Sequence, residues 1–146
     1  MGKRGGSEFV ELLGAVTRRV RALMAEAYAR HGVGSAQAKL IRHIGKNSRI
    51  SQADLARATG TAPTLTGRSI EPLVRRGWVR RRRSEGDRRQ YVLELAAAGE
   101  RARAELEAAR GEVVARVAAA LDAEDLDDFE RIGRKLLAAL AQGDDV

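Results

Sequence analysis

A turn flanked by strand-forming residues is the feature that most limits the folds open to this chain. The segment Ser-Glu-Gly-Asp at residues 84–87 has the chemistry of a turn. Aromatic, β-branched and aliphatic residues on both sides of it suit strands: Trp78, Val79, Tyr91, Val92, Leu93 and Leu95. Apolar residues elsewhere recur every three to four positions, as helices require. The sequence therefore predicts a mainly α fold with one β-hairpin, to which residues 49–50 could add a third short strand.

Most of the excess charge of the chain lies on this hairpin and just before it. Between Arg75 and Arg89 there are eight arginines and two acids, a net +6, where all 146 residues together carry +7. Guanidinium groups bind phosphates through paired hydrogen bonds, and the release of counterions drives their association with polyanions. A nucleic acid is thus the predicted partner. The alternative is a solvated charge run on a surface loop.

Two shorter helices are expected before the hairpin. Ser51 begins a sequence like a capping box, Ser-Gln-Ala-Asp, which opens a helix over 51–59 that ends at Gly60. The next helix opens near Pro63 and ends at Gly77, and its expected inner face is apolar: Leu65, Ile70, Leu73 and Val74. Helix, glycine turn, helix, glycine and basic hairpin is the order of a winged helix-turn-helix. In that fold the second of these helices enters the DNA major groove.

The candidate DNA contacts are small polar or cationic residues on these helices and on the hairpin. They are Ser51, Gln52, Thr61, Pro63, Thr64, Thr66, Arg68, Arg75, Arg82, Ser84, Asp87, Arg88 and Arg89. Side chains of these types reach base edges and phosphates. Thr61 is equally well explained as a helix cap, and Trp78 is better explained as a core residue than as a stacking platform for bases.

Long amphipathic helices are expected on both sides of this central unit. One spans 7–30; Ser35 caps a second that breaks at Gly45; a third runs from 96–99 to about 120, and Asp122 caps the last. Their apolar stripes are longer than the central unit can cover, which predicts a homodimer. The expected interface residues are Phe9, Leu12, Val16, Leu106, Val113, Val117, Leu126 and Phe129. The chain is accordingly divided into an N-terminal dimerisation helix (1–34), a DNA-binding domain (35–95) and C-terminal dimerisation helices (96–146).

The central residues resemble the MarR family of bacterial transcription regulators. The similarity covers about residues 40–99 and rests on Arg-Gly-Trp-Val at 76–79, on Asp87 and Arg89 of the hairpin, and on a helix that opens with Gly99. The resemblance implies a homodimer with one β-wing per subunit, which binds a palindromic operator as a repressor. It also implies that Arg89 contacts DNA, that Asp87 orients it, and that a small aromatic or phenolic effector binds under the winged helix.

Three departures from the family pattern stand out. Pro72 lies inside the expected DNA-reading helix, which it could kink or shorten. Ala96-Ala97-Ala98 replaces the usual Leu-Thr before the fifth-helix glycine, so a threonine cap is missing. The absence of cysteine excludes sensing of peroxide by thiol oxidation. For the effector site the candidates are Tyr28, His31 and His43, each of which has an ordinary structural or surface role as the alternative.

Several other classes of function lack support in the sequence. The chain has no cysteine, which excludes disulfides and thiolate metal sites, and its two histidines are too few to suggest another metal site. We expect no cofactor, no metal and no enzymatic activity. Residues 1–7 have no apolar run behind them, so we expect a disordered tip rather than a secretory signal, and a cytoplasmic protein that joins the nucleoid when DNA-bound. The alternatives are a non-specific architectural DNA or RNA binder and, less well supported, a hydrolase or transferase with a hidden active site.

Overall fold

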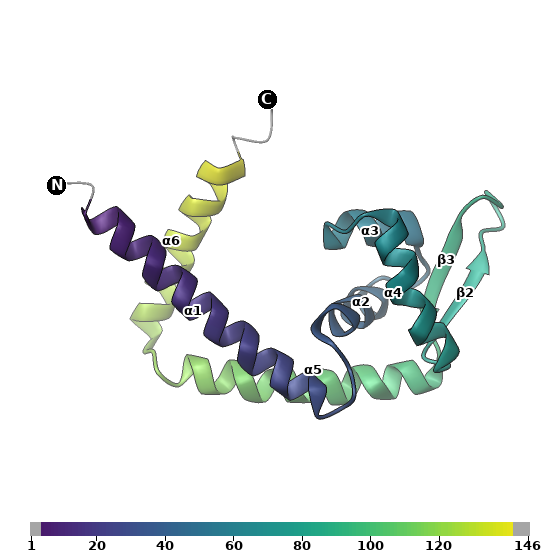
Figure 1. Cartoon of the computed structure of the whole chain (residues 1–146), viewed down its shortest axis with the longest axis horizontal. Coiled ribbons are helices and arrows are strands. Elements are labelled where there is room, and N and C mark those ends of the chain that lie inside the picture. Colours follow the sequence, from purple (N-terminus) through teal and green to yellow (C-terminus); the bar gives the residue numbers. More distant parts are fainter. Residues whose placement is uncertain (1–3, 142–146) are drawn as a thin grey trace. The chain divides into compact units, whose positions relative to one another are not determined.

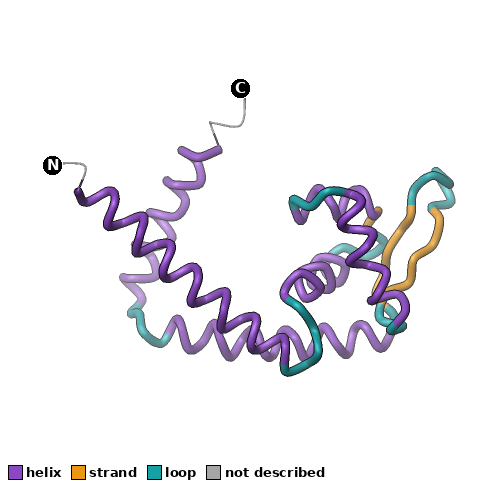
Figure 2. Tube along the Cα trace, in the orientation of Figure 1, coloured by secondary structure: helices purple, strands orange, loops and turns teal. Residues whose placement is uncertain are grey.

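Six helices and three short strands make up the described chain, which confirms the mainly α fold with a β-wing (Figures 1 and 2). The structure is a computed structural model that describes residues 4–141. In chain order the elements are α1 (Arg4–Ala29), α2 (Ser35–Lys46), β1 (Ile50–Ser51), α3 (Gln52–Thr59), α4 (Pro63–Arg75), β2 (Val79–Arg83), β3 (Tyr91–Leu95), α5 (Ala97–Ala118) and α6 (Ala123–Ala141). No helix among residues 4–141 is long and apolar enough to cross a membrane.

The three strands form one antiparallel sheet in the order β1-β3-β2. Within the hairpin Val79 pairs with Leu95 and Arg83 with Tyr91, and the short strand β1 adds Ile50 opposite Leu93. The β2–β3 hairpin and its turn at residues 84–90 are called the wing from here on. Figure 2 shows the wing extending beyond the helices that carry it.

The core lies where α2, α3, α4 and the sheet meet the first half of α5. Its fully buried large residues are Ile41, Ile44, Leu55, Ile70, Leu73, Leu93 and Leu106, with Thr66 among them. Trp78 packs against this cluster and is partly buried, as a core residue rather than a base-stacking platform would be. Leu106 was predicted at the dimer interface, and this is wrong, because it is 1% exposed inside this core.

Two glycines allow α5 to pack closely on the winged unit. A Cβ on Gly99 would lie 2.0 Å from the backbone oxygen of Trp78, so only glycine fits where α5 begins. A Cβ on Gly45 would lie 2.4 Å from Cδ of Arg103. The prediction that α2 breaks at Gly45 is therefore wrong: the helix continues to Lys46, and the glycine makes room for an arginine of α5.

Helix ends follow the capping rules at some predicted positions and not at others. Asp122 and Asp125 cap the start of α6 reciprocally, since each carboxylate accepts the other residue's backbone N–H. The residue before α2 is Gly34, without a side-chain cap, so the predicted cap at Ser35 is wrong. Pro72 lies inside α4, which nevertheless runs to Arg75, so it does not end the helix early.

Residues up to Gly111 and residues from Glu112 onward form two separate units. In the first, α1 already begins at Arg4, so the expected disordered tip is wrong for residues 4–7, and residues 1–3 lie outside the described part. Phe9, Leu12 and Val16 on α1 are exposed. In the second unit α6 buries none of its residues and exposes Leu126 and Phe129; residues 142–146 of the predicted C-terminal segment lie outside the described range.

Candidate nucleic-acid interface

The orientation of α4 about its own axis decides which of its side chains face outward. Thr66, Ile70 and Leu73 form its buried face, at the spacing of four and three that one helix face requires. The expectation that Thr66 lies on the outer, DNA-reading face is therefore wrong: it is 0% exposed, and its hydroxyl donates to the carbonyl oxygen of Ala62 at 3.1 Å. Leu65, predicted on the inner face, is instead 53% exposed.

The outer face of α4 presents Thr64, Arg68 and Arg75. All three are exposed, and they line a shallow hollow together with Gly67, Glu71 and Arg81. Within residues 4–141 the guanidinium groups of Arg68 and Arg75 make neither ion pairs nor hydrogen bonds, so both are available to phosphates or base edges. Pro63 is the first residue of the helix, where its missing N–H costs nothing.

The arginines of β2 alternate between the two faces of the wing, as the sequence predicts for any strand. Arg80 and Arg82 lie on one face and both pair with Glu94 of β3. On the other face Arg81 pairs with Glu71 of α4 at 2.9 Å, which ties the wing to that helix. Two carboxylates thus compensate two of these three positive charges within the protein.

Glu94 is a fixed negative charge at the centre of this arrangement. The hydrogen bond from Arg82 lowers the pKa of Glu94, burial opposes this shift, and the positive charges of Arg82, Arg80 and Arg49 add to it. The carboxyl group is therefore ionised at neutral pH, and the pairing of the β2 arginines persists there.

Hydrogen bonds fix the backbone at the tip of the wing. The Ser84 N–H donates to the carbonyl of Gln90 at 2.9 Å and closes the turn. Asp87 accepts the backbone N–H of Arg89 on Oδ1 at 3.0 Å, and its own N–H donates to the hydroxyl of Ser84 at 3.4 Å. Asp87 therefore holds Arg89 through the main chain rather than through the guanidinium group.

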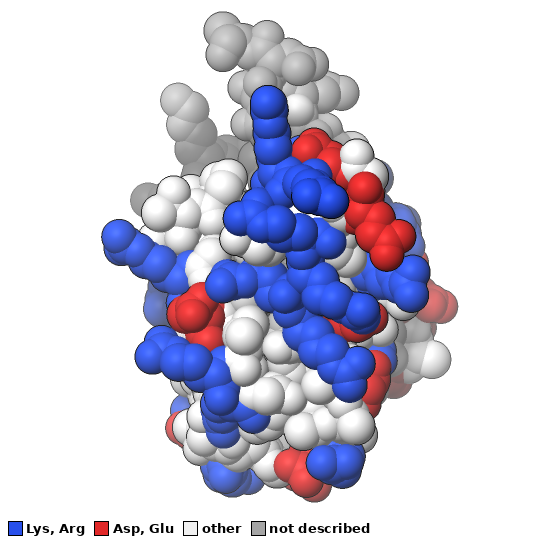
Figure 3. All heavy atoms as spheres, turned by 90° about the vertical axis from the view of Figure 1, so that its right-hand side faces the viewer, with Lys and Arg blue, Asp and Glu red and all other residues white. Residues whose placement is uncertain are grey.

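Of the wing arginines, the two at the tip have side chains without internal partners in the described chain. Arg88 and Arg89 are exposed, and within residues 4–141 their side chains make no ion pair or hydrogen bond. Arg83, by contrast, donates to the carbonyl of Arg88 at 2.6 Å and lies 5.0 Å from the ring centre of Tyr91. Lys and Arg side chains cover much of the face that carries the wing, as Figure 3 shows.

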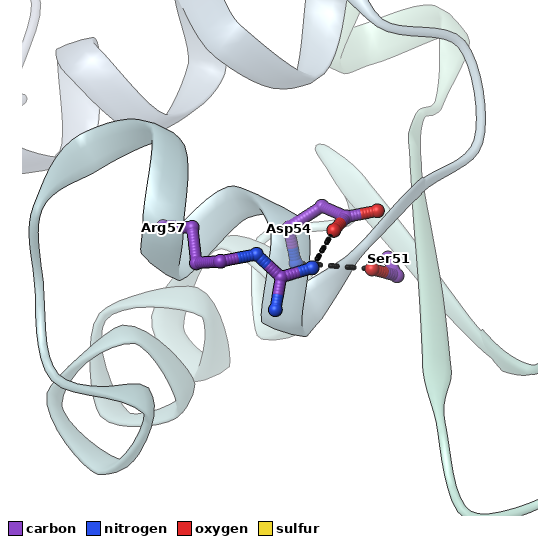
Figure 4. A network of polar contacts seen from close by, with 3 residues as sticks. All are labelled: Ser51, Asp54 and Arg57. Carbon is purple, nitrogen blue, oxygen red and sulfur yellow. Dashed lines mark hydrogen bonds and ion pairs between the residues drawn. The ribbon is translucent and has the colours of Figure 1, made fainter.

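Two predicted DNA contacts at the start of α3, Ser51 and Gln52, are half-buried. The Ser51 hydroxyl accepts the backbone N–H of Asp54 at 3.0 Å, which confirms the predicted cap (Figure 4). Hydrogen bonding to the Ser51 side chain, which is the larger effect, and to Arg57 lowers the pKa of the Asp54 carboxyl group. Gln52 reaches toward α4, where its Nε2 would lie 3.2 Å from a Cβ on Gly67, and its Oε1 is buried without a partner.

Thr61 does not cap α4. The residue before the helix is Ala62, which provides no side-chain hydrogen bond, and the Thr61 hydroxyl donates weakly to the carbonyl of Thr59 at 3.4 Å. Gly60 in the left-handed conformation, with φ of 64°, turns the chain from α3 into this segment.

Arg49 lies at this face but was not among the predicted DNA contacts. Arg49 precedes β1 with φ of 60°, a left-handed conformation that costs about 1 kcal/mol for a residue with a Cβ. It lines a hollow of about 260 Å³ together with Arg82, Arg83, Ser84 and Glu85 of the wing. The sequence predicted residues 49–50 as a possible third strand beside the hairpin, but it did not single out Arg49 among the candidate DNA contacts.

The three effector candidates do not line a described hollow. Tyr28 is buried in the core cluster. His31 is exposed, with Nδ1 3.6 Å from the carboxylate of Glu105. His43 is half-buried on α2, and burial first, then the positive charges of nearby lysines and Arg42, lower its pKa.

Comparison with known proteins agrees with this architecture. Residues 31–90 match the sequence model of the MarR family. Transcriptional repressor MprA of Escherichia coli (strain K12) is 33% identical over 97 residues, which are 66% of this chain and 55% of MprA. HTH-type transcriptional regulator BilQ of Clostridium symbiosum is 33% identical over 72 residues, or 49% of this chain and 50% of BilQ. The chain thus spans about half the length of the curated relatives it matches.

Solved structures share the fold over most of the chain. A mutant MarR from E. coli complexed with operator DNA aligns with a TM-score of 0.80 and 21% identity, covering 89% of this chain and 94% of that one. The YusO protein of Bacillus subtilis aligns with a TM-score of 0.73 and 22% identity, covering 95% and 99%. At these identities the likeness concerns the fold.

Proposed function

This chain belongs to the MarR family, and we propose that it is a transcription regulator that binds double-stranded operator DNA. The observation that carries this proposal is the set of unpaired arginines. Arg68 and Arg75 on α4 and Arg88 and Arg89 at the wing tip are exposed and have no acidic partner within residues 4–141. A similar fold, that of a mutant MarR from E. coli, has been solved with operator DNA.

In the proposed complex α4 enters the major groove with its first turns. Thr64 and Arg68 then meet base edges, and Arg68 is suited to pair with the O6 and N7 acceptors of a guanine. Arg75, two turns further along, and the wing-tip arginines are positioned for phosphates or the minor groove. The ion pair between Arg81 and Glu71 keeps wing and helix in one arrangement, so both approach the DNA together.

The proposed active form is a homodimer on a palindromic operator. Its support is the exposed apolar surface of α1 and α6, with Phe9, Leu12, Leu126 and Phe129 all solvent-accessible in the single chain. The remaining interface candidates, Val113 and Val117, are half-buried on α5. Two reading heads related by a two-fold axis contact half-sites about one DNA turn, ~34 Å, apart. Sedimentation at micromolar concentration tests this: a monomer would contradict both the dimer and the palindrome.

The regulator is proposed to act as a cytoplasmic repressor that a small aromatic or phenolic ligand releases. With Tyr28 buried in the core, the polar candidates for receiving such a ligand are His31 and His43. The lowered pKa keeps the His43 ring neutral at pH 7, suited to hydrogen bonding with a phenol. Release of bound operator by an added phenolic acid, lost in His43→Ala, is the expected result; loss of DNA affinity without ligand dependence would remove His43 from this role.

Specific DNA recognition separates this proposal from a non-specific architectural role. We expect selection from randomised DNA at 0.15 M salt to give a palindromic site preferred by about 10³-fold or more over competitor DNA. Arg68→Ala should lower that preference at one position of each half-site. Arg101→Ala on α5 removes the same charge from an exposed position and serves as the matched control. Equal affinity for all sequences would favour the architectural binder.

A further inference from the structure

One apolar side chain in the winged helix is left outside its core. Every large apolar residue of the segment 35–95 is buried or half-buried except Leu65, which is 53% exposed in the first turn of α4. The inner face of the helix is already filled by Thr66, Ile70 and Leu73, so the core does not require a leucine at position 65. Exposure of a single leucine is ordinary on a protein surface, but this one stands on the helix turn that the proposed function places deepest in DNA.

The position of Leu65 on the helix sets what it can meet. Successive residues lie about 100° apart round an α-helix, so Leu65 lies on the flank of the outer face next to Thr64. Glu71, which joins the wing through Arg81, is about 120° away by the same geometry. Leu65 therefore projects from the flank of α4 opposite the wing. An α-helix with its side chains is about as wide as the major groove, ~12 Å, so both flanks of an inserted helix touch the groove walls.

We propose that Leu65 is a specificity-determining residue that contacts the 5-methyl group of a thymine in the major groove. The thymine methyl is the apolar feature that the groove offers, and apolar side chains recognise it by contact alone. Thr64 and Arg68 on the outer face supply hydrogen bonds, and a leucine on the flank beside Arg68 adds a preference for T·A that those groups cannot provide. This inference rests on the proposed DNA-binding function and adds a chemical identity to one base position in each half-site.

Deoxyuridine tests this contact because it lacks only the methyl group of thymidine. After selection of a preferred site, each thymine is replaced in turn by deoxyuridine and binding is measured with the wild-type protein and with Leu65→Ala. Loss of one methyl contact should weaken wild-type binding about fourfold per half-site, or about fifteenfold when both half-sites are changed. Leu65→Ala should bind thymine and uracil sites equally at that position, while Leu65→Met, of similar volume, should keep most of the discrimination.

The controls separate this inference from the proposal beneath it. Deoxyuridine at the other thymines is the internal control and should give the same ratio for wild type and Leu65→Ala. A wild type that binds a selected site but tolerates uracil everywhere overturns the role of Leu65 and leaves the DNA-binding function standing. The same holds if one uracil is equally harmful to wild type and to Leu65→Ala. Failure to select any preferred DNA overturns both.

Discussion

Replacing Asp87 by alanine should weaken operator binding, although it removes a negative charge from a protein surface proposed to face phosphates. Two effects of opposite sign compete. The carboxylate accepts the backbone N–H of Arg89 at 3.0 Å and so holds the wing tip in one conformation before binding. The same carboxylate repels nearby phosphates. The net sign depends on which effect is larger.

The magnitudes favour the hydrogen bond. A hydrogen bond that orders a turn contributes about 1 kcal/mol. One charge at roughly 8 Å from a phosphate in water is worth about 0.5 kcal/mol before screening, and about half of that or less at 0.15 M salt. At 0.15 M salt Asp87→Ala should therefore lose about 0.75 kcal/mol net per subunit, or about 1.5 kcal/mol per dimer, which lowers affinity about twelvefold.

Two variants isolate the charge effect in the same turn. Asp87→Asn keeps an oxygen that can accept the Arg89 N–H while removing the charge. Glu85→Ala removes an equal charge from a residue that makes no hydrogen bond or ion pair within the described chain. Both should bind the operator about two- to fivefold more tightly at low salt, an advantage that fades as salt rises.

Fluorescence anisotropy with a labelled operator at several salt concentrations provides the measurement. If Asp87→Ala instead tightens binding to the same extent as Glu85→Ala, the predicted role of the Asp87 hydrogen bond is wrong. That outcome would mean that the wing tip acts as bulk positive charge and that its backbone conformation contributes nothing to affinity.

Two further predictions follow from the same packing. Arg89→Ala should weaken operator binding more than Arg80→Ala while leaving the melting temperature nearly unchanged, because Arg80 is already paired within the wing and Arg89 is free; equal losses in a binding titration would contradict this. Gly99→Ala should lower the free energy of unfolding by about 1–3 kcal/mol in urea denaturation, because the new Cβ meets the Trp78 backbone oxygen. Gly111→Ala on the same helix meets nothing and should stabilise by up to about 1 kcal/mol; parallel changes in the two variants would refute the steric explanation.

The order of helices and strands could be predicted from the sequence because capping, turn and glycine residues mark their ends locally. The turn at 84–87, the Ser51 cap and the glycines at 60 and 77 are all signals carried within a few residues. The phase of α4 could not be predicted in the same way. The pattern placed Leu65 inside and Thr66 outside on polarity, whereas Thr66 is buried because its hydroxyl finds a carbonyl one turn back.

Contacts between distant segments account for the other differences. Gly45 was predicted to break α2 because glycine disfavours helices. Its actual role is to leave room for the side chain of Arg103, 58 residues further along the chain. Leu106 shared a stripe with Val113 and Val117, yet only the beginning of that stripe lies on the winged unit. The spacing of apolar residues cannot show at which residue the stripe of α5 leaves the core of the winged unit, because that depends on where the core ends.

If the chain binds an operator as proposed, the internal pairing of the β2 arginines should also affect how fast that operator is found. A regulator meets a large excess of unrelated DNA, and every uncompensated cation prolongs its stay on the wrong sequence. Glu94 and Glu71 hold Arg80, Arg82 and Arg81 in ion pairs, so these side chains stiffen the wing without adding in full to its grip on any duplex. Under the proposed function we therefore expect a shorter dwell time on random sequence, so that a larger part of the genome is scanned in the same interval.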